Sequence, residues 1–154
     1  MTAEHGKPLT AKLIDSLYLE AMTLADQARQ YFDQDGKFDR EDLGPIERVQ
    51  FSCESLRVTT RLMHTVSWLL NRKAVAAGEL SEEEGREPER RLGRAGDAIS
   101  DKEVLDAFPV RAREVIEASA DLYTRVRRLD EGLVIKDPRP SPARQLQDRL
   151  GSSF

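Results

Sequence analysis

Apolar residues along this chain recur at alternating intervals of three and four, the period of a helix that packs nearly parallel or antiparallel to its neighbours. The pattern predicts a first helix over 10–33, with Thr10 as its N-cap. A second helix over 45–77 should begin at Pro45, whose missing donor costs nothing there, and end at Gly78. A third is predicted over 109–131, with Gly132 as its stop. With no useful alternating strand pattern, the chain is predicted to be all-α, an antiparallel three-helix bundle with a long central helix.

The segments between and after these helices are less regular. Residues 34–44 are expected to form a turn-rich connection, and the irregular segment 79–108 to hold a short helix that opens with Ser81 and Glu84 as a capping box. Three prolines follow Lys136, so residues 1–135 are predicted to be the bundle domain and residues 136–154 a flexible, Pro-rich C-terminal tail. Leu146, Leu150 and Phe154 would share an apolar face if the tail folded on a partner.

The central helix carries two apolar stripes. The first, the 46–77 stripe, keeps strict three-four spacing through Ile46, Val49, Cys53, Leu56, Thr60, Met63, Ser67, Leu70, Ala74 and Ala77. The second, the 51–69 stripe, consists of Phe51, Val58, Leu62, Val66 and Leu69. Both could be internal, because a middle helix contacts two others. The outer helices are shorter, however, so the 51–69 stripe is predicted to contribute a homodimer interface, the twofold dimer being the commonest assembly.

A polar stripe of the same helix holds the only tryptophan. Arg57, Arg61, His64 and Trp68 lie on it together, and Trp and Arg are the residues most enriched in binding hot spots. These four residues are therefore the predicted partner-binding surface. The alternative is structural: the arginines pair with carboxylates of the neighbouring helices, and the tryptophan, a highly buried residue on average, covers the edge of the bundle.

Composition narrows the classes of partner and the compartment. The 154 residues carry a net charge of −4, which gives no general attraction to nucleic acid or to acidic lipid. No apolar run approaches the ~20 residues of a membrane span, and the N-terminus lacks the apolar core of a signal peptide. A single cysteine cannot form an internal disulfide, so a reducing cytoplasm is expected.

Residues suited to catalysis or metal binding are sparse. There are two histidines and no Glu-x-x-His pair, and the acidic segment 33–36 lacks the glycine and glutamate positions of a calcium loop. Cys53 has no sequence neighbour that would lower the pKa of its thiol, and no phosphate-binding glycine loop is present. The sequence therefore predicts no enzyme, no metal site and no cofactor.

The central helix resembles the bacterial family called regulator of CtrA degradation (RcdA). The matching residues there are Leu56, Thr59, Thr60, Arg61, Leu62, Met63, Ser67, Trp68, Leu69, Leu70, Ala74 and Val75. Weaker similarity extends over residues 13–133, through the first helix (Tyr18, Glu20, Ala21, Met22, Leu24, Ala28, Arg29 and Tyr31) and the third (Ser119, Leu122, Tyr123, Arg125, Leu129 and Asp130).

The resemblance implies a non-catalytic three-helix bundle that dimerises and helps to deliver cell-cycle regulatory proteins to the ClpXP protease. The implied partners are a response-regulator-like adaptor associated with the protease, the cargo proteins and a second copy of the chain. A different class stays open, a helical bundle that binds a small molecule or caps another enzyme. A closed pocket with convergent polar groups would favour the small-molecule binder.

Overall fold

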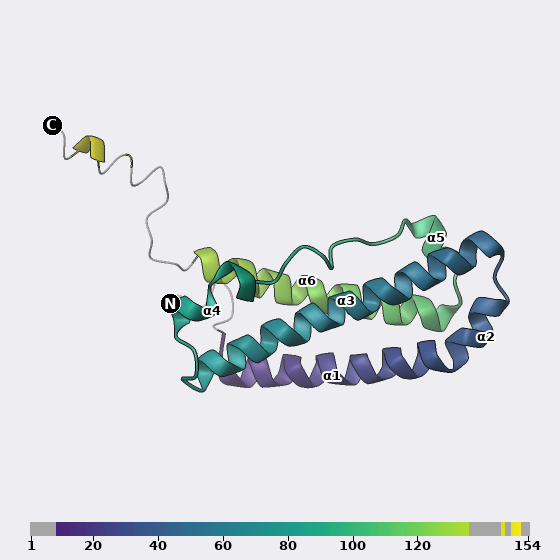
Figure 1. The fold of residues 1–154 in the computed structure, drawn as a ribbon, viewed down its shortest axis with the longest axis horizontal. Helices are drawn as coiled ribbons and strands as arrows, with labels where there is room; N and C mark the ends of the chain where they lie inside the picture. The colour runs from purple at the N-terminus through teal and green to yellow at the C-terminus, as the bar shows by residue number, and fades with distance from the viewer. Residues whose placement is uncertain (1–8, 136–145, 147–148, 152–154) are drawn as a thin grey trace, which may run out of the picture.

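The computed structural model describes residues 9–135, 146 and 149–151. Three long helices, α1 (Ala11–Asp33), α3 (Pro45–Ala76) and α6 (Val110–Ile135), lie side by side, with α1 running opposite to α3 and α6 (Figure 1). Short helices α2 (Asp35–Glu41), α4 (Glu82–Gly85) and α5 (Lys102–Asp106) and the 3-10 turn η2 (Pro88–Arg90) occupy the connections. The predicted all-α bundle with a long central helix is confirmed. The predicted antiparallel arrangement holds for α1 against the other two helices, but α3 and α6 run parallel because the link between them returns along the bundle (Figure 1).

The helix ends follow the expected local chemistry with two exceptions. Thr10 caps α1 by accepting the backbone N–H of Leu13 at 3.1 Å, and Gly78 takes a left-handed φ of 78° after α3. The structure differs at 34–44, where a turn-rich connection was predicted and α2 forms a short helix. It differs again at Gly132, which lies inside α6 and does not end it. A glycine need not end a helix when a residue beyond it is buried in apolar contacts, as Leu133 is.

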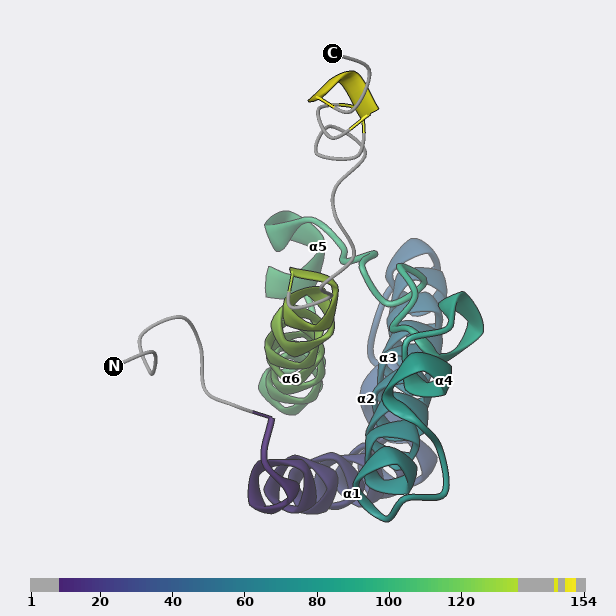
Figure 2. The same ribbon diagram turned by 90° about the vertical axis from the view of Figure 1, so that its left-hand side faces the viewer.

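The link from α3 to α6 returns along the length of the bundle, because α3 ends near the start of α1 whereas α6 begins beside α5 (Figure 1). Between η2 and α5 no residue of this link is helical. We call residues 91–101 the strap. Seen along the bundle, the strap lies on the side of α3 and α6 that faces away from α1 (Figure 2).

The core is built from the apolar three-four face of α1, from α6 and from an unexpected face of α3. Six apolar residues of α1 at three-four spacing are buried: Ile14, Leu17, Ala21, Leu24, Ala28 and Tyr31. On α3 the buried positions are Phe51, Glu54, Val58, Arg61, Leu62, Thr65, Trp68, Leu69 and Arg72. The bundle therefore covers the 51–69 stripe and much of the polar stripe, and it leaves the regular 46–77 stripe outside.

The predictions for the C-terminal tail extend beyond the residues that the structure describes. Most of residues 136–154, including Phe154, lie outside the described residues, and so does the predicted flexibility of that tail. Leu146 and Leu150 are described, both with exposed side chains on helical residues.

Candidate partner-binding surface

Arg61 is one of the two charged residues of α3 that are at most 1% exposed, the other being Glu54. The side chain of Arg61 is 1% exposed, yet it projects from α3 and not from a flexible loop. Its Nε donates to the carbonyl of Gly96 at 3.2 Å and its Nη2 to the carbonyl of Ala98 at 2.5 Å. Nη1 donates to the hydroxyl of Ser119 on α6 at 3.2 Å. Burial lowers the pKa of Arg61, and the nearby carboxylate of Glu54 opposes that shift. Arg61 thus ties the strap to both α3 and α6.

Glu54, which precedes Arg61 on the same helix, supplies the negative charge that balances the guanidinium. Its side chain is fully buried, and its Oε2 lies 4.0 Å from Nη2 of Arg61. Oε1 accepts hydrogen bonds from Nη1 of Arg57 and from the hydroxyl of Ser100 in the strap. A buried ion pair is retained at little net cost only where hydrogen bonds satisfy both charges, and here the strap provides several of them. The polar face of α3 is therefore inside the bundle, where it binds the strap through hydrogen bonds.

Trp68 belongs to a second group of buried hydrogen bonds, further along α3, that joins this helix to α6 and the strap. Its ring is buried, and the indole Nε1 donates to Oδ1 of Asp130 on α6 at 2.9 Å. Asp130 also accepts from Nε and Nη2 of Arg91, at 2.6 and 2.9 Å, which holds the start of the strap. This charge-assisted bond raises the pKa of Arg91. One carboxylate thus joins α3, α6 and the strap.

The predicted partner-binding surface is corrected by this geometry. Arg61 and Trp68 face the interior of the bundle, so neither can contact another protein in this conformation. Arg57 is partly exposed, but its guanidinium is bound to Glu54 and Ser100. His64 alone of the four is exposed and points away from the core. The structural alternative is right that Arg61 and Trp68 are internal. The partners of the arginines, however, are Glu54 of their own helix, Ser119 and the strap, and not carboxylates of the neighbouring helices.

The predicted dimer interface is corrected as well. Four of its five residues are buried within one chain, namely Phe51, Val58, Leu62 and Leu69, and Val66 is half-buried. The reason lies in the position of α1 and α6, which both pack on the side of α3 that carries this stripe. A second copy cannot use side chains that the first copy already covers.

The surface that remains open is the 46–77 stripe, on the opposite side of α3. Its large side chains are strongly exposed: Ile46 71%, Val49 63%, Leu56 68%, Met63 66% and Leu70 47%. Cys53 is exposed between them. Isolated exposed apolar residues are ordinary, but a row of five on one helix marks an interaction surface. The sequence did contain this signal, as the strict three-four spacing of the stripe, but the same spacing is also typical of a stripe that faces the core.

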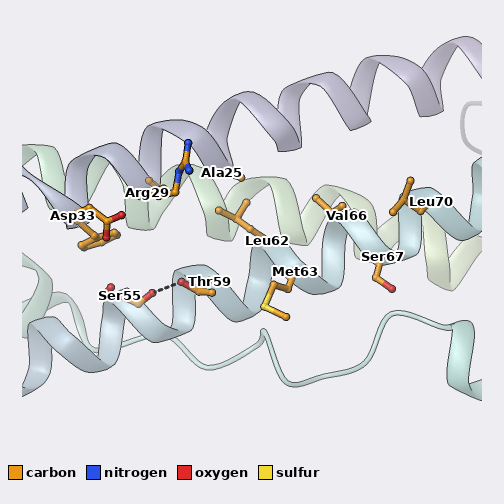
Figure 3. Close-up of a pocket in the computed structure, with 12 residues that line it drawn as sticks. Ala25, Arg29, Asp33, Ser55, Thr59, Leu62, Met63, Val66, Ser67 and Leu70 are labelled. Atoms are coloured by element: carbon orange, nitrogen blue, oxygen red, sulfur yellow. Dashed lines mark hydrogen bonds between the residues drawn. The ribbon is translucent and has the colours of Figure 1, made fainter.

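A groove runs beside this stripe, between α1 and α3, with a volume of about 540 Å³ (Figure 3). The α1 wall holds Ala25, Ala28, Arg29, Phe32 and Asp33, and the α3 wall holds Ser55, Thr59, Leu62, Met63, Val66, Ser67 and Leu70. The lining is mainly apolar, with one arginine and one aspartate towards the α2 end of α1. Its mainly apolar lining suits the apolar face of a helix from another chain.

The described residues offer no alternative built around a reaction. Among residues 9–135 and the short described part of the tail, no group of three His, Cys, Asp or Glu side chains could hold a metal ion. Within that same part of the chain, no helix is long and apolar enough to cross a membrane.

The comparisons with known proteins agree with this fold. Residues 6–154 match the model of a family described as "Protein of unknown function (DUF1465)". A crystal structure of RcdA from Caulobacter crescentus CB15 is 30% identical in sequence with a TM-score of 0.65, over 81% of this chain and 93% of that one. No curated protein matches significantly. The family model spans nearly the whole sequence, and the similarity to RcdA covers most of both chains. This chain therefore belongs to the DUF1465 family and shares its fold with RcdA.

Proposed function

We propose that this chain is a non-catalytic adaptor that helps to deliver cell-cycle regulatory proteins to the ClpXP protease in the bacterial cytoplasm. The observation that carries the proposal is the long apolar stripe on α3, exposed on a scaffold similar to RcdA. An adaptor needs a rigid surface that other proteins can bind, and it needs no reactive group. The expected partners are a response-regulator-like adaptor at the protease, the cargo and a second copy of this chain.

The fastened polar face supports this role through rigidity. Arg61 and Asp130 each join α3, α6 and the strap, so the helix that carries the stripe is held on its far side by buried hydrogen bonds. A preorganised surface loses less conformational entropy when a partner binds. An adaptor then acts by raising the effective concentration of cargo at the protease, without lowering the barrier of any chemical step.

A bundle that binds a small molecule fits the groove less well. Its volume lies within the range of ligand pockets, but Met63 and Leu70 in its wall remain largely exposed. A drug-sized ligand is normally buried over 70–90% of its surface, which this open groove would not achieve. A docked helix would cover the same wall along its length.

The direct experiment is reconstituted degradation. Purified ClpXP, the response-regulator-like adaptor and a candidate cargo from the same organism are combined with increasing amounts of this chain. We expect a saturable acceleration of cargo loss, with no change for a substrate that ClpXP degrades unaided. Unchanged cargo degradation together with no complex of the chain with the adaptor, the protease or the cargo would overturn the proposal.

His64→Ala tests whether the polar stripe takes part. His64 is the one member of the predicted partner-binding set that is openly exposed, so its loss should leave the fold unchanged. If a partner contacts it, the concentration of chain that gives half-maximal delivery should rise. An unchanged value would assign recognition to other surfaces and leave the adaptor role standing.

A further inference from the structure

A small pocket of about 220 Å³ lies at the end of the bundle where α1 begins, α3 ends and α4 follows (Figure 1). Two charged residues line it, Arg72 of α3 and Glu82 of α4. The rest of the lining is apolar and consists of Leu9, Ala11, Ile14, Val75, Ala76 and Leu80. The pocket therefore combines an apolar space with one cationic and one anionic side chain.

Arg72 is buried in this wall with donors left over. The residue is 5% exposed, and its Nη2 donates to both carboxylate oxygens of Glu82, at 3.0 and 3.1 Å. The strongest arginine–carboxylate pairs use two nitrogens, one for each oxygen, whereas here one nitrogen makes both bonds. Among the described residues, Nε and Nη1 of Arg72 find no acceptor, and these two atoms carry three of the five N–H donors of a guanidinium. A buried cation with unused donors is costly, so the site favours an acceptor that uses them.

Glu82 is a partner that Arg72 can exchange. Its side chain is 54% exposed on the first residue of the four-residue helix α4. Its other ion pair is with Arg86, at 3.7 Å between Oε2 and Nη2. An exposed carboxylate regains water when it leaves an ion pair, so its departure is inexpensive. An incoming carboxylate can thus replace Glu82 on Arg72 without leaving the buried guanidinium unpaired.

The start of α1 adds a second source of positive potential at the same pocket. The first N–H groups of an α-helix have no partner within the helix and give that end a partial positive charge. Thr10 caps the N–H of Leu13, and Ala11, the first residue of this 23-residue helix, lines the pocket. An anion in the pocket is therefore attracted both by α1 and by Arg72.

The volume and the lining specify the remainder of the ligand. At about 30 Å³ for each water-sized group, the pocket holds about seven non-hydrogen atoms. Because most of the lining is apolar, a short hydrocarbon fits it better than a second polar group does. Sulfate or phosphate would have to exchange its hydration for contact with apolar side chains. The chemistry that fits is a carboxylate on a short branched hydrocarbon, as in isovalerate.

We propose that this pocket binds a short apolar carboxylate, which takes the place of Glu82 on Arg72. The same chemistry occurs in a free branched-chain acid and in the last residue of a peptide that ends in valine or leucine. The proposal does not depend on the adaptor function, because binding is measured on this chain alone and either can fail without the other.

Titration of isovalerate into the full chain, followed by the backbone amide signals in nuclear magnetic resonance spectra, tests the site. We expect saturable shifts centred on Ala11, Val75 and Leu80, with a dissociation constant of about 0.1–1 mM for so small a ligand. Isovaleramide has the same shape without the charge and should bind at least about tenfold more weakly. No saturable shifts around the pocket, or equal binding of the acid and the amide, would overturn the proposal. Sulfate binding as tightly as isovalerate would overturn the apolar part of it.

Glu82→Gln makes a prediction that a purely structural ion pair does not. The substitution removes the competing charge, so the affinity for isovalerate should rise at least about threefold. Glu83→Gln is the matched control, an equal change of charge at the next residue of α4, which does not line the pocket, and it should change the affinity by less than about twofold. Equal effects of the two substitutions would overturn the exchange at Arg72.

Arg72→Met keeps the apolar length of the side chain and removes the cation. If circular dichroism shows that this variant is folded, its affinity for isovalerate should fall at least about tenfold, and unchanged binding would overturn the proposal. If the variant does not fold, the comparison of Glu82→Gln with Glu83→Gln decides. An acetylated tripeptide that ends in valine identifies the source of the carboxylate. Binding tighter than that of isovalerate, and lost when the C-terminus is amidated, assigns the pocket to peptide ends, whereas weaker binding assigns it to the free acid.

Discussion

Replacing Trp68 by alanine should destabilise the bundle strongly. The ring is 2% exposed, and its Nε1 hydrogen bond to Asp130 spans α3 and α6 at 2.9 Å. Truncating a buried Trp to Ala costs about 3–5 kcal/mol, within which a hydrogen bond to a charged acceptor accounts for about 1.5–3 kcal/mol. Asp130 keeps its two bonds from Arg91, so the carboxylate is not left unpaired. For a chain of this size, about 2–4 °C of Tm per kcal/mol converts the loss to roughly 6–20 °C.

The assay is thermal and urea unfolding followed by far-ultraviolet circular dichroism, since the substitution removes the chain's only indole fluorophore. Trp68→Phe separates the two contributions, because it keeps most of the apolar volume and loses the N–H donor. His64→Ala is the control on the exposed side of the same helix and should stay within about 0.5 kcal/mol of the unaltered protein. If Trp68→Ala melts within that same margin, the tryptophan is not a buried fastening and the assignment of this face to the interior fails.

Two further predictions concern the strap and Tyr31, the buried tyrosine of α1. Gly96→Ala should lower the free energy of unfolding in urea by about 1–3 kcal/mol, because a Cβ there would lie 2.5 Å from the Tyr123 ring. Gly93→Ala is the control and should be nearly neutral, because a Cβ there meets nothing within 4 Å. Equal effects of the two substitutions would contradict close packing of the strap against Tyr123. Burial, followed by the hydrogen bond to Asp39, raises the pKa of Tyr31. The contribution of the neutral Tyr31 side chain to stability is therefore complete below pH about 10 and is lost as pH rises further. Tyr31→Phe should reduce the loss of stability at alkaline pH, and an unchanged profile of stability against pH would refute this prediction.

The outer helices could be predicted from sequence because each has one apolar face. For α1, the spacing from Ile14 to Tyr31 coincides with its buried positions, and Thr10 caps it as expected. Local rules suffice where only one side of a helix is able to face the core. The extension of α6 beyond Gly132 depends on tertiary contact, which glycine propensity does not report.

The orientation of α3 could not be predicted in the same way, because its two apolar stripes offer competing answers. Regular spacing favoured the 46–77 stripe, but the structure buries a face that includes Glu54, Arg61 and Arg72. Hydropathy counts such residues as polar, and burial becomes acceptable only when partners distant in sequence satisfy them. For Arg61 those partners come from the strap, 35 and 37 residues further along the chain, a segment without a readable pattern, and for Arg72 the partner is Glu82 of α4. The buried tryptophan was the available clue.

Arg61 recognises the strap by its main chain, since the acceptors are the carbonyls of Gly96 and Ala98. Every residue type offers a carbonyl, so this contact places almost no demand on side-chain identity at 98 and 99, and substitutions there should be tolerated across relatives. Gly96, where the Tyr123 ring leaves no room for a Cβ, is the exception. The path of the strap can thus be inherited without its sequence, so a connector that defies alignment between relatives can still follow the same course over the bundle.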